Sequence, residues 1–151
     1  MTNVSIVYAN LSGANIELQA KAVVAAMKAM KVKRLIWIST LGIYDEVPGA
    51  FGEFNNKMLG NSYLSTYAAA AKIIEDSGLE FTIIRPAWMT NKDEVDYELT
   101  HRHDAFKGTE ISRKSIAAEV VRLIQSPTDS IGDSLGINKP NTDGDRPEWE
   151  M

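Results

Sequence analysis

The sequence contains no cysteine among its 151 residues. This absence excludes disulfide bonds, thiolate metal sites and a cysteine nucleophile. The sequence also has no excess of basic residues. It contains 16 Lys and Arg and 20 Asp and Glu, which gives a formal net charge of −4. Nucleic-acid-binding domains usually concentrate basic residues on one face. We therefore expect no nucleic-acid partner.

Long apolar runs are absent as well. No stretch of about 18 apolar residues marks a membrane span, and the first residues lack the charged-then-apolar pattern of a signal peptide. We therefore expect a cytoplasmic protein that has no membrane partner. Residues 1–151 are expected to form one domain, which is long enough to enclose a hydrophobic core.

The sequence does contain an alternation of short apolar runs and amphipathic segments. The apolar runs predict four strands, at residues 4–11, 34–40, 81–88 and 134–140. Helical periodicity predicts three helices, the first after Asn15, the others over residues 63–77 and 112–126. Strands that alternate with helices indicate parallel βαβ units. The expected fold class is α/β, with a small parallel sheet of about four strands and flanking helices.

Several local features of these elements can be predicted. Asn15 and Ser112 are expected to cap the first and third helices, and Gly78 to end the second helix in a left-handed conformation. Segments 41–61 and 90–109 are predicted to be irregular, the second a mobile polar loop, and residues 141–151 a turn-rich tail. The buried face of the first helix is predicted to consist of Leu18, Ala22, Val23, Ala26 and Met30.

The two histidines, His101 and His103, lie in the polar segment 90–109 beside several acidic residues. Side chains of these types can bind a metal ion, but their spacing in the sequence does not define a metal site. We favour a solvated loop and predict no metal site.

Three separated motifs carry a family resemblance: KRLIWISTLGIYDEVPG at 33–49, SGLEFTIIRPAWMTN at 77–91 and FKGTEISRKSIA at 106–117. Together they resemble the NmrA-like branch of the short-chain dehydrogenase/reductase superfamily, over about Val4 to Pro147. The resemblance implies an NAD(P)-binding, Rossmann-like fold in which residues 4–11 correspond to the fourth strand. We therefore expect a partial Rossmann-like domain that lacks the first three strand–helix units of the family.

Dinucleotide binding in such folds needs a glycine-rich turn at a helix N-terminus. Neither G-x-G-x-x-G nor G-x-x-G-x-x-G occurs in the sequence, and the loop after the first strand has a single glycine, Gly13. We therefore expect NAD or NADP to belong to the complete family fold and not to be bound tightly by this chain alone. The resemblance assigns the nicotinamide and ribose side to three strand ends, with Ala9, Asn10 and Leu11, then Ser39, then Pro86, Ala87 and Trp88.

Catalysis in the superfamily uses a tyrosine, a lysine four residues later and a Ser or Thr that orients the substrate. Thr40 takes the position of the Ser or Thr. The tyrosine is either Tyr67, with Lys72 five residues later and about 140° around the helix, or Tyr63, which is followed after four residues by Tyr67. Neither alignment places an ammonium beside a phenol, and a tyrosine with its ordinary pKa near 10 is a poor base at neutral pH.

These observations favour a non-catalytic member that acts by binding a ligand or a partner. Two alternatives stay open: an oxidoreductase or redox sensor whose cofactor-binding half lies outside this sequence, and a fragment without a function of its own. Strand 4–11 contains no proline and no charge to protect a free edge. We expect a homodimer through that edge, with the alanine-rich helix 63–77 as the competing interface.

Overall fold

The computed structural model describes residues 3–150. Its main sheet has five strands, of which the first four in spatial order run parallel and the last pairs antiparallel. In spatial order they are β1 (Ile6–Ala9), β2 (Arg34–Ile38), β3 (Glu80–Pro86), β7 (Asp133–Asn138) and β5 (Glu98–Thr100). The predicted α/β class is confirmed, with one strand more than expected.

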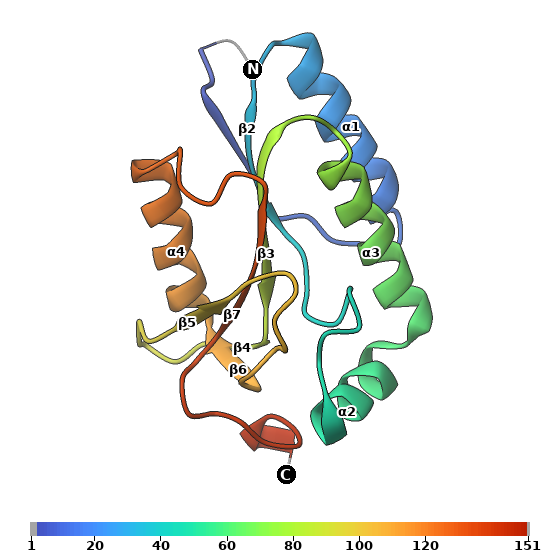
Figure 1. Ribbon diagram of the computed structural model, residues 1–151, viewed down its shortest axis with the longest axis vertical. Coiled ribbons are helices and arrows are strands. Elements are labelled where there is room, and N and C mark those ends of the chain that lie inside the picture. The colour runs from blue at the N-terminus through green and yellow to red at the C-terminus, as the bar shows by residue number, and fades with distance from the viewer. Residues whose placement is uncertain (1–2, 151) are drawn as a thin grey trace.

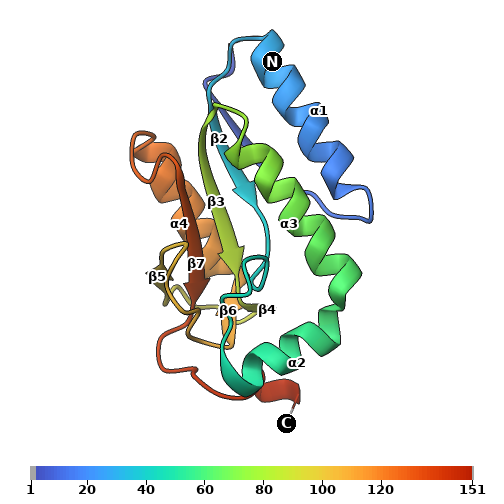
Figure 2. The same ribbon diagram turned by 45° about the vertical axis from the view of Figure 1, so that its right-hand side comes forward.

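Helices cover both faces of this sheet. The helices of the described chain are α1 (Ile16–Ala29), α2 (Gly49–Leu59), α3 (Asn61–Glu75) and α4 (Arg113–Gln125). α1 and α3 lie on one side of the sheet and α4 on the other, and each side has its own hydrophobic core (Figure 1, Figure 2). None of the helices within residues 3–150 is long and apolar enough to cross a bilayer.

Two short elements complete the fold at one end of the main sheet. β4 (Trp88–Thr90) and β6 (Glu110–Ser112) form a parallel pair of their own. A single turn of 3-10 helix, Glu148–Glu150, closes the described chain and lies at the same end as α2 (Figure 1). The predicted tail 141–151 contains this turn, and its last residue, Met151, lies outside the described residues.

Two of the three predicted helix ends, those at Ser112 and Gly78, agree with the structure. Ser112 caps α4, because its hydroxyl accepts a hydrogen bond from the backbone N–H of Ser115 at 3.0 Å. Gly78 follows α3 with a φ of +77°, the left-handed conformation that glycine adopts without strain. Asn15 stands at the N-cap of α1, but its side-chain oxygen accepts from Gln19 at 2.8 Å instead of from a helix N–H.

The predicted buried face of α1 is wrong except at Val23, which is partly buried and packs against the core. Leu18 is 64% exposed and Met30 is 50% exposed. The buried residues of this helix are Ile16, Ala20, Val24 and Met27. Because alanine, leucine, valine and methionine occupy most of the circumference of α1, periodicity alone does not choose which apolar face meets the sheet.

Segment 41–61 was predicted to be irregular, and it contains α2. Phe51, Phe54 and Met58 do recur at helical steps, but Gly49 and Gly52 conceal the pattern. Gly52 is required for packing, since a Cβ at this position would lie 2.0 Å from the carbonyl oxygen of Val47. A glycine that is a helix breaker by propensity therefore serves here as a point of close backbone approach.

Segment 90–109 was predicted to lack regular structure, and it contains β5. Polar groups of this segment hydrogen-bond to α4 and to the N-cap residue of that helix. The Tyr97 hydroxyl donates to Glu119 at 2.8 Å, and the carbonyl of Glu94 accepts from the Ser112 hydroxyl at 2.6 Å. The prediction missed β5 because a three-residue edge strand leaves almost no periodic signal.

Candidate functional site

A cavity of about 260 Å³ opens at the carboxyl ends of β1, β2 and β3. Ligands of parallel α/β sheets bind at this edge. Its lining includes every predicted site residue except Ala9: Asn10, Leu11, Ser39, Thr40, Tyr63, Tyr67, Pro86, Ala87 and Trp88. Ala9 is 5% exposed and belongs to the hydrophobic core shared with α1.

Charge is absent from the lining. Within the described chain, the residues that line the cavity are apolar, aromatic, amide-bearing or hydroxyl-bearing. A neighbouring groove of about 530 Å³ shares Ser12, Leu59, Tyr63 and Tyr67 with the cavity, and its lining of described residues is also uncharged. These walls therefore offer no ion pair to a phosphate group.

Backbone hydrogen bonds hold the strand ends that form the floor of the cavity. The N–H of Ser39 donates to the carbonyl of Ile84 at 2.7 Å, and the N–H of Ala87 donates to Ile137 at 3.0 Å. The Ser39 hydroxyl is different: the residue is only 7% exposed, and its Oγ has no hydrogen-bond partner in the described chain. Because buried polar groups are normally paired, this hydroxyl is a candidate contact for a polar atom of a ligand.

Tyr63 and Tyr67, one turn apart on α3, form the aromatic wall. Their rings are stacked, with centroids 4.4 Å apart and planes inclined by 27°. Burial, followed by hydrogen bonding to Tyr67, raises the pKa of Tyr63 above its usual value near 10. At neutral pH this phenol is protonated, so it can donate a hydrogen bond or a proton but does not act as a base.

Lys72 lies away from the cavity. Its ammonium pairs with Asp76 at 2.9 Å on the exposed side of α3, and its side chain is 77% exposed. Hydrogen bonding to Asp76 raises the pKa of Lys72. Tyr67 is only 5% exposed and faces the cavity. The five-residue spacing therefore separates the two groups as expected from helical geometry.

Trp88 forms another aromatic part of the cavity wall and is held by α2. Its indole N–H donates to Oδ1 of Asn55 at 3.1 Å, and its ring lies 5.6 Å from that of Phe54 between centroids. Asn55 is completely buried. The sequence prediction missed Asn55 and the cavity residue Leu59 because it missed α2; the helical spacing of Phe51, Phe54 and Met58 was the signal that could have revealed it.

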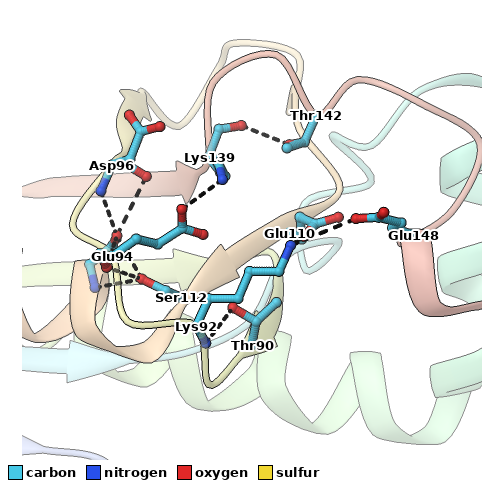
Figure 3. A network of polar contacts seen from close by, with 10 residues as sticks. Thr90, Lys92, Glu94, Asp96, Glu110, Ser112, Lys139, Thr142 and Glu148 are labelled. Atoms are coloured by element: carbon cyan, nitrogen blue, oxygen red, sulfur yellow. Dashed lines mark hydrogen bonds and ion pairs between the residues drawn. The ribbon is translucent and has the colours of Figure 1, made fainter.

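A polar network involves the end of β4 and the segment that follows it (Figure 3). The Lys92 ammonium lies between Glu110 and Glu148, at 3.3 Å and 3.7 Å, and so joins β6 to the C-terminal turn. Lys139 pairs with Glu94 at 2.7 Å. These contacts join the segment that follows β4 to β6, to the C-terminal turn and to the residue that follows β7.

A second polar cluster anchors the loop that leaves the cavity. The Tyr44 hydroxyl hydrogen-bonds to Glu75 at 2.6 Å and Ser134 at 3.0 Å. The guanidinium carbons of Arg85 and Arg102 lie 5.1 Å and 4.5 Å from the centroid of its ring. Burial, and then the hydrogen bond to Glu75, raises the pKa of Tyr44 to about 12. This cluster ties the segment after Ser39 and Thr40 to α3, β3 and β7.

The histidines do not come together with the acidic residues as a metal site. His101 pairs through Nδ1 with Asp133 at 2.9 Å, and His103 lines a separate cavity beside Tyr44. No group of three or more His, Asp or Glu side chains that could hold a metal ion occurs within residues 3–150.

Comparison with known proteins identifies a family. The family described as NAD(P)H-binding matches residues 1–127. No match is found among curated proteins. The chain is 48% identical to a Rossmann-fold NAD(P)-binding family protein from Shigella flexneri, with a TM-score of 0.80, over 96% of this chain and 65% of that protein. It therefore spans about two thirds of the length of that relative.

Two further solved structures are similar. A short-chain dehydrogenase/reductase from Veillonella parvula DSM 2008, determined in complex with NADP, is 25% identical with a TM-score of 0.88, over 97% of this chain and 68% of that one. ChuY, an anaerobillin reductase from Escherichia coli O157:H7, is 17% identical with a TM-score of 0.76, over 92% of this chain and 66% of that one, and shows the fold alone. The chain belongs to the NAD(P)H-binding family with a Rossmann-like fold.

Proposed function

We propose that the chain is an NmrA-like member of its family and binds the nicotinamide side of NAD(P), or a small uncharged ligand of similar shape, without Tyr–Lys catalysis. The observation that carries this proposal is the uncharged cavity at the carboxyl ends of β1, β2 and β3. It combines two aromatic walls, Tyr63 with Tyr67 and Trp88, with the unpaired Ser39 hydroxyl.

The residues present fit one end of a dinucleotide. A volume of about 260 Å³ lies just below the range of about 300–1,000 Å³ that is typical of pockets for drug-sized ligands. A single ring with its polar substituent suits this volume, and the Ser39 hydroxyl, which has no hydrogen-bond partner in the described chain, is a candidate hydrogen-bond partner for that substituent. The aromatic walls provide flat surfaces against which a ring can stack.

The phosphate side of a dinucleotide has no comparable support in this chain. The sequence has no glycine-rich turn to bring backbone N–H groups close to a pyrophosphate. The adjoining groove near Gly13 is lined by uncharged described residues. We therefore expect this chain alone to bind a dinucleotide weakly, with most of the contact made by the nicotinamide ring.

A second candidate function is an NAD(P)-dependent oxidoreductase, in which another polypeptide segment supplies the phosphate-binding turn. The hydroxyl groups of Ser39, Thr40 and Tyr63 at one cavity favour it. NAD(P), when bound, supplies hydride chemistry. By the family resemblance, Thr40 would orient a carbonyl group and the protonated Tyr63 phenol would donate a proton from its Oη. Lys72, the lysine that follows on the same helix, pairs with Asp76 on its exposed side and does not assist this proton transfer.

Indole N–H signals in NMR spectra provide a direct test, because the chain has three tryptophans. Trp88 lines the cavity, whereas Trp37 is buried in the core and Trp149 is 48% exposed at the C-terminal turn. Titration with nicotinamide mononucleotide should shift the Trp88 signal saturably and leave that of Trp149 in place. The Trp88→Phe variant assigns the signal, and Trp149→Phe is the matched control. An unchanged Trp88 signal at millimolar ligand would overturn the proposal.

A further inference from the structure

The second half of α2 carries a single buried side chain, that of Asn55. Within residues 53–60 it is the one residue in the buried class, and it is completely buried, whereas the three residues that follow it are exposed. Its Oδ1 atom accepts the indole N–H of Trp88 at 3.1 Å. Among the described residues, this is the only hydrogen bond that a side chain of α2 makes. One polar contact therefore ties this part of the helix to the cavity wall.

The buried amide of Asn55 is only half satisfied. Its Nδ2 atom has no hydrogen-bond partner in the described chain, although buried polar groups are normally paired. A leucine of similar size would fill the same space without leaving a buried donor unpaired. The interaction that the asparagine alone supplies is the acceptor for Trp88. The contact with the cavity wall therefore accounts for a polar residue at this buried position.

α2 joins α3 through one residue, Gly60, which ends the first helix and begins the second. Its backbone has a φ of +80° and a ψ of 155°, a conformation that is essentially restricted to glycine. A Cβ at this position would meet no atom within 4 Å, so backbone geometry rather than packing requires the glycine. The two helices meet at an angle here (Figure 2). Because Leu59 and Tyr63 on either side of the junction both line the cavity, the angle sets the shape of its wall.

The indole of Trp88 contacts α2 while its own backbone is fixed. The backbone N–H of Trp88 donates to the carbonyl of Thr109 at 3.2 Å, beside the β4–β6 pair. On α2, the ring of Phe54 lies 5.6 Å from the indole between centroids, next to the acceptor on Asn55. With the backbone fixed, the side-chain rotamer of Trp88 determines both its contact with α2 and the surface that it presents to the cavity.

We propose that Asn55 is a positioning residue that couples α2 to a ligand in the cavity. The inference rests on the proposed function, since it requires a ring that stacks against Trp88. Such a ring restricts the indole and so stabilises its hydrogen bond to Asn55. The bond in turn holds the end of α2, and with it Leu59, at the cavity. By thermodynamic linkage, the ligand stabilises this position of α2 as much as α2 stabilises the bound ligand.

Indole N–H signals of the ligand-free chain test the positioning role. Asn55→Leu removes the acceptor at similar volume, so the Trp88 signal should shift and its exchange with solvent should become about tenfold faster, the scale of one hydrogen bond. Trp37, which is buried in the core shared with α1 and α3, reports on the fold, and its signal should stay in place. Asn56→Leu, at the neighbouring exposed position, is the matched control and should leave both signals unchanged. An unchanged Trp88 signal in Asn55→Leu overturns the proposal.

Hydrogen exchange of the unsubstituted chain tests the coupling without any substitution. Saturating nicotinamide mononucleotide should slow exchange of the Trp88 indole and of the backbone amides of residues 56–60 at least about threefold, a part of the free energy of one hydrogen bond. Ligand that binds without slowing exchange in residues 56–60 overturns the proposal. This measurement decides the matter even where Asn55→Leu fails to fold.

Calorimetric titration of the variants separates the coupling from the proposed function. Asn55→Leu should raise the dissociation constant of nicotinamide mononucleotide at least about threefold, whereas Asn56→Leu should leave it unchanged. Equal affinities of Asn55→Leu and the unsubstituted chain would contradict the coupling and leave the proposed function intact. Absence of binding by the unsubstituted chain would contradict the proposed function and, with it, the coupling to a ligand. The ligand-free Trp88 signal would then still show whether Asn55 positions the indole.

Discussion

Tyr67 and Lys72, five residues apart on α3, face different surroundings. Tyr67 is 5% exposed and lines the cavity, whereas the Lys72 ammonium pairs with Asp76 at 2.9 Å in solvent. This separation removes the lysine from any chemistry at the cavity. It also yields a prediction that distinguishes binding by the cavity walls from catalysis of the Tyr–Lys kind.

Lys72→Ala should leave the affinity of the cavity for nicotinamide mononucleotide, and any weak reductase rate, within about threefold of the original values. The physical reason is that the ammonium is neither in the cavity nor bound to a residue that lines it. Asp76→Ala, which removes its partner, is the matched control. A loss of rate of about 100-fold, the scale of an acid/base group, would show that Lys72 reaches the reacting atoms.

The stability of the fold should fall as pH rises from about 10 to about 12, partly through Tyr44. Burial raises the pKa of this phenol to about 12 in the folded chain, so the unfolded chain loses the proton first. The stabilisation is fully present below pH of about 10 and is lost as pH approaches the folded value. Tyr44→Phe should make the free energy of unfolding, measured in urea, less dependent on alkaline pH. An unchanged pH dependence in this variant would contradict the assignment.

Gly52→Ala should destabilise the fold by about 1–3 kcal/mol, the range for overpacking in a filled interior. The added Cβ would meet the carbonyl oxygen of Val47, which cannot move away without shifting the start of α2. Glu53→Ala, at the neighbouring exposed position, should change the free energy of unfolding by less than about 0.5 kcal/mol. Denaturant unfolding measures both. Equal effects from the two substitutions would show that the close approach at Gly52 is not a constraint.

Much of the site could be predicted because the order and direction of the strands determine where most of its residues lie. The apolar runs at 34–40 and 81–88 indicate buried parallel strands, and parallel strands end at one edge of their sheet. Residues at the carboxyl ends of those runs, such as Ser39 and Trp88, therefore come together at the cavity. The fold class follows from the same alternation of strands and helices.

The remaining features depend on tertiary contacts that a single sequence does not display. α1 is apolar on several faces, and only the positions of the sheet and α3 decide that Ile16 and Met27 are buried while Leu18 is exposed. The role of Asn55 depends on the approach of Trp88 from a distant strand. The sequence prediction missed both features because packing between distant segments decides them, and local helix propensity does not.

Calorimetric titration of this chain with NADPH and with nicotinamide mononucleotide tests the central claim most directly. The described cavity and groove lack charged residues, and the sequence lacks a glycine-rich turn. The adenosine phosphate half of NADPH should therefore contribute little to the binding free energy. We predict that both ligands bind with similar dissociation constants, weaker than about 10 μM. A dissociation constant for NADPH below about 10 μM, equivalent to about 7 kcal/mol of binding free energy, would show that this chain holds the whole dinucleotide and would contradict the account.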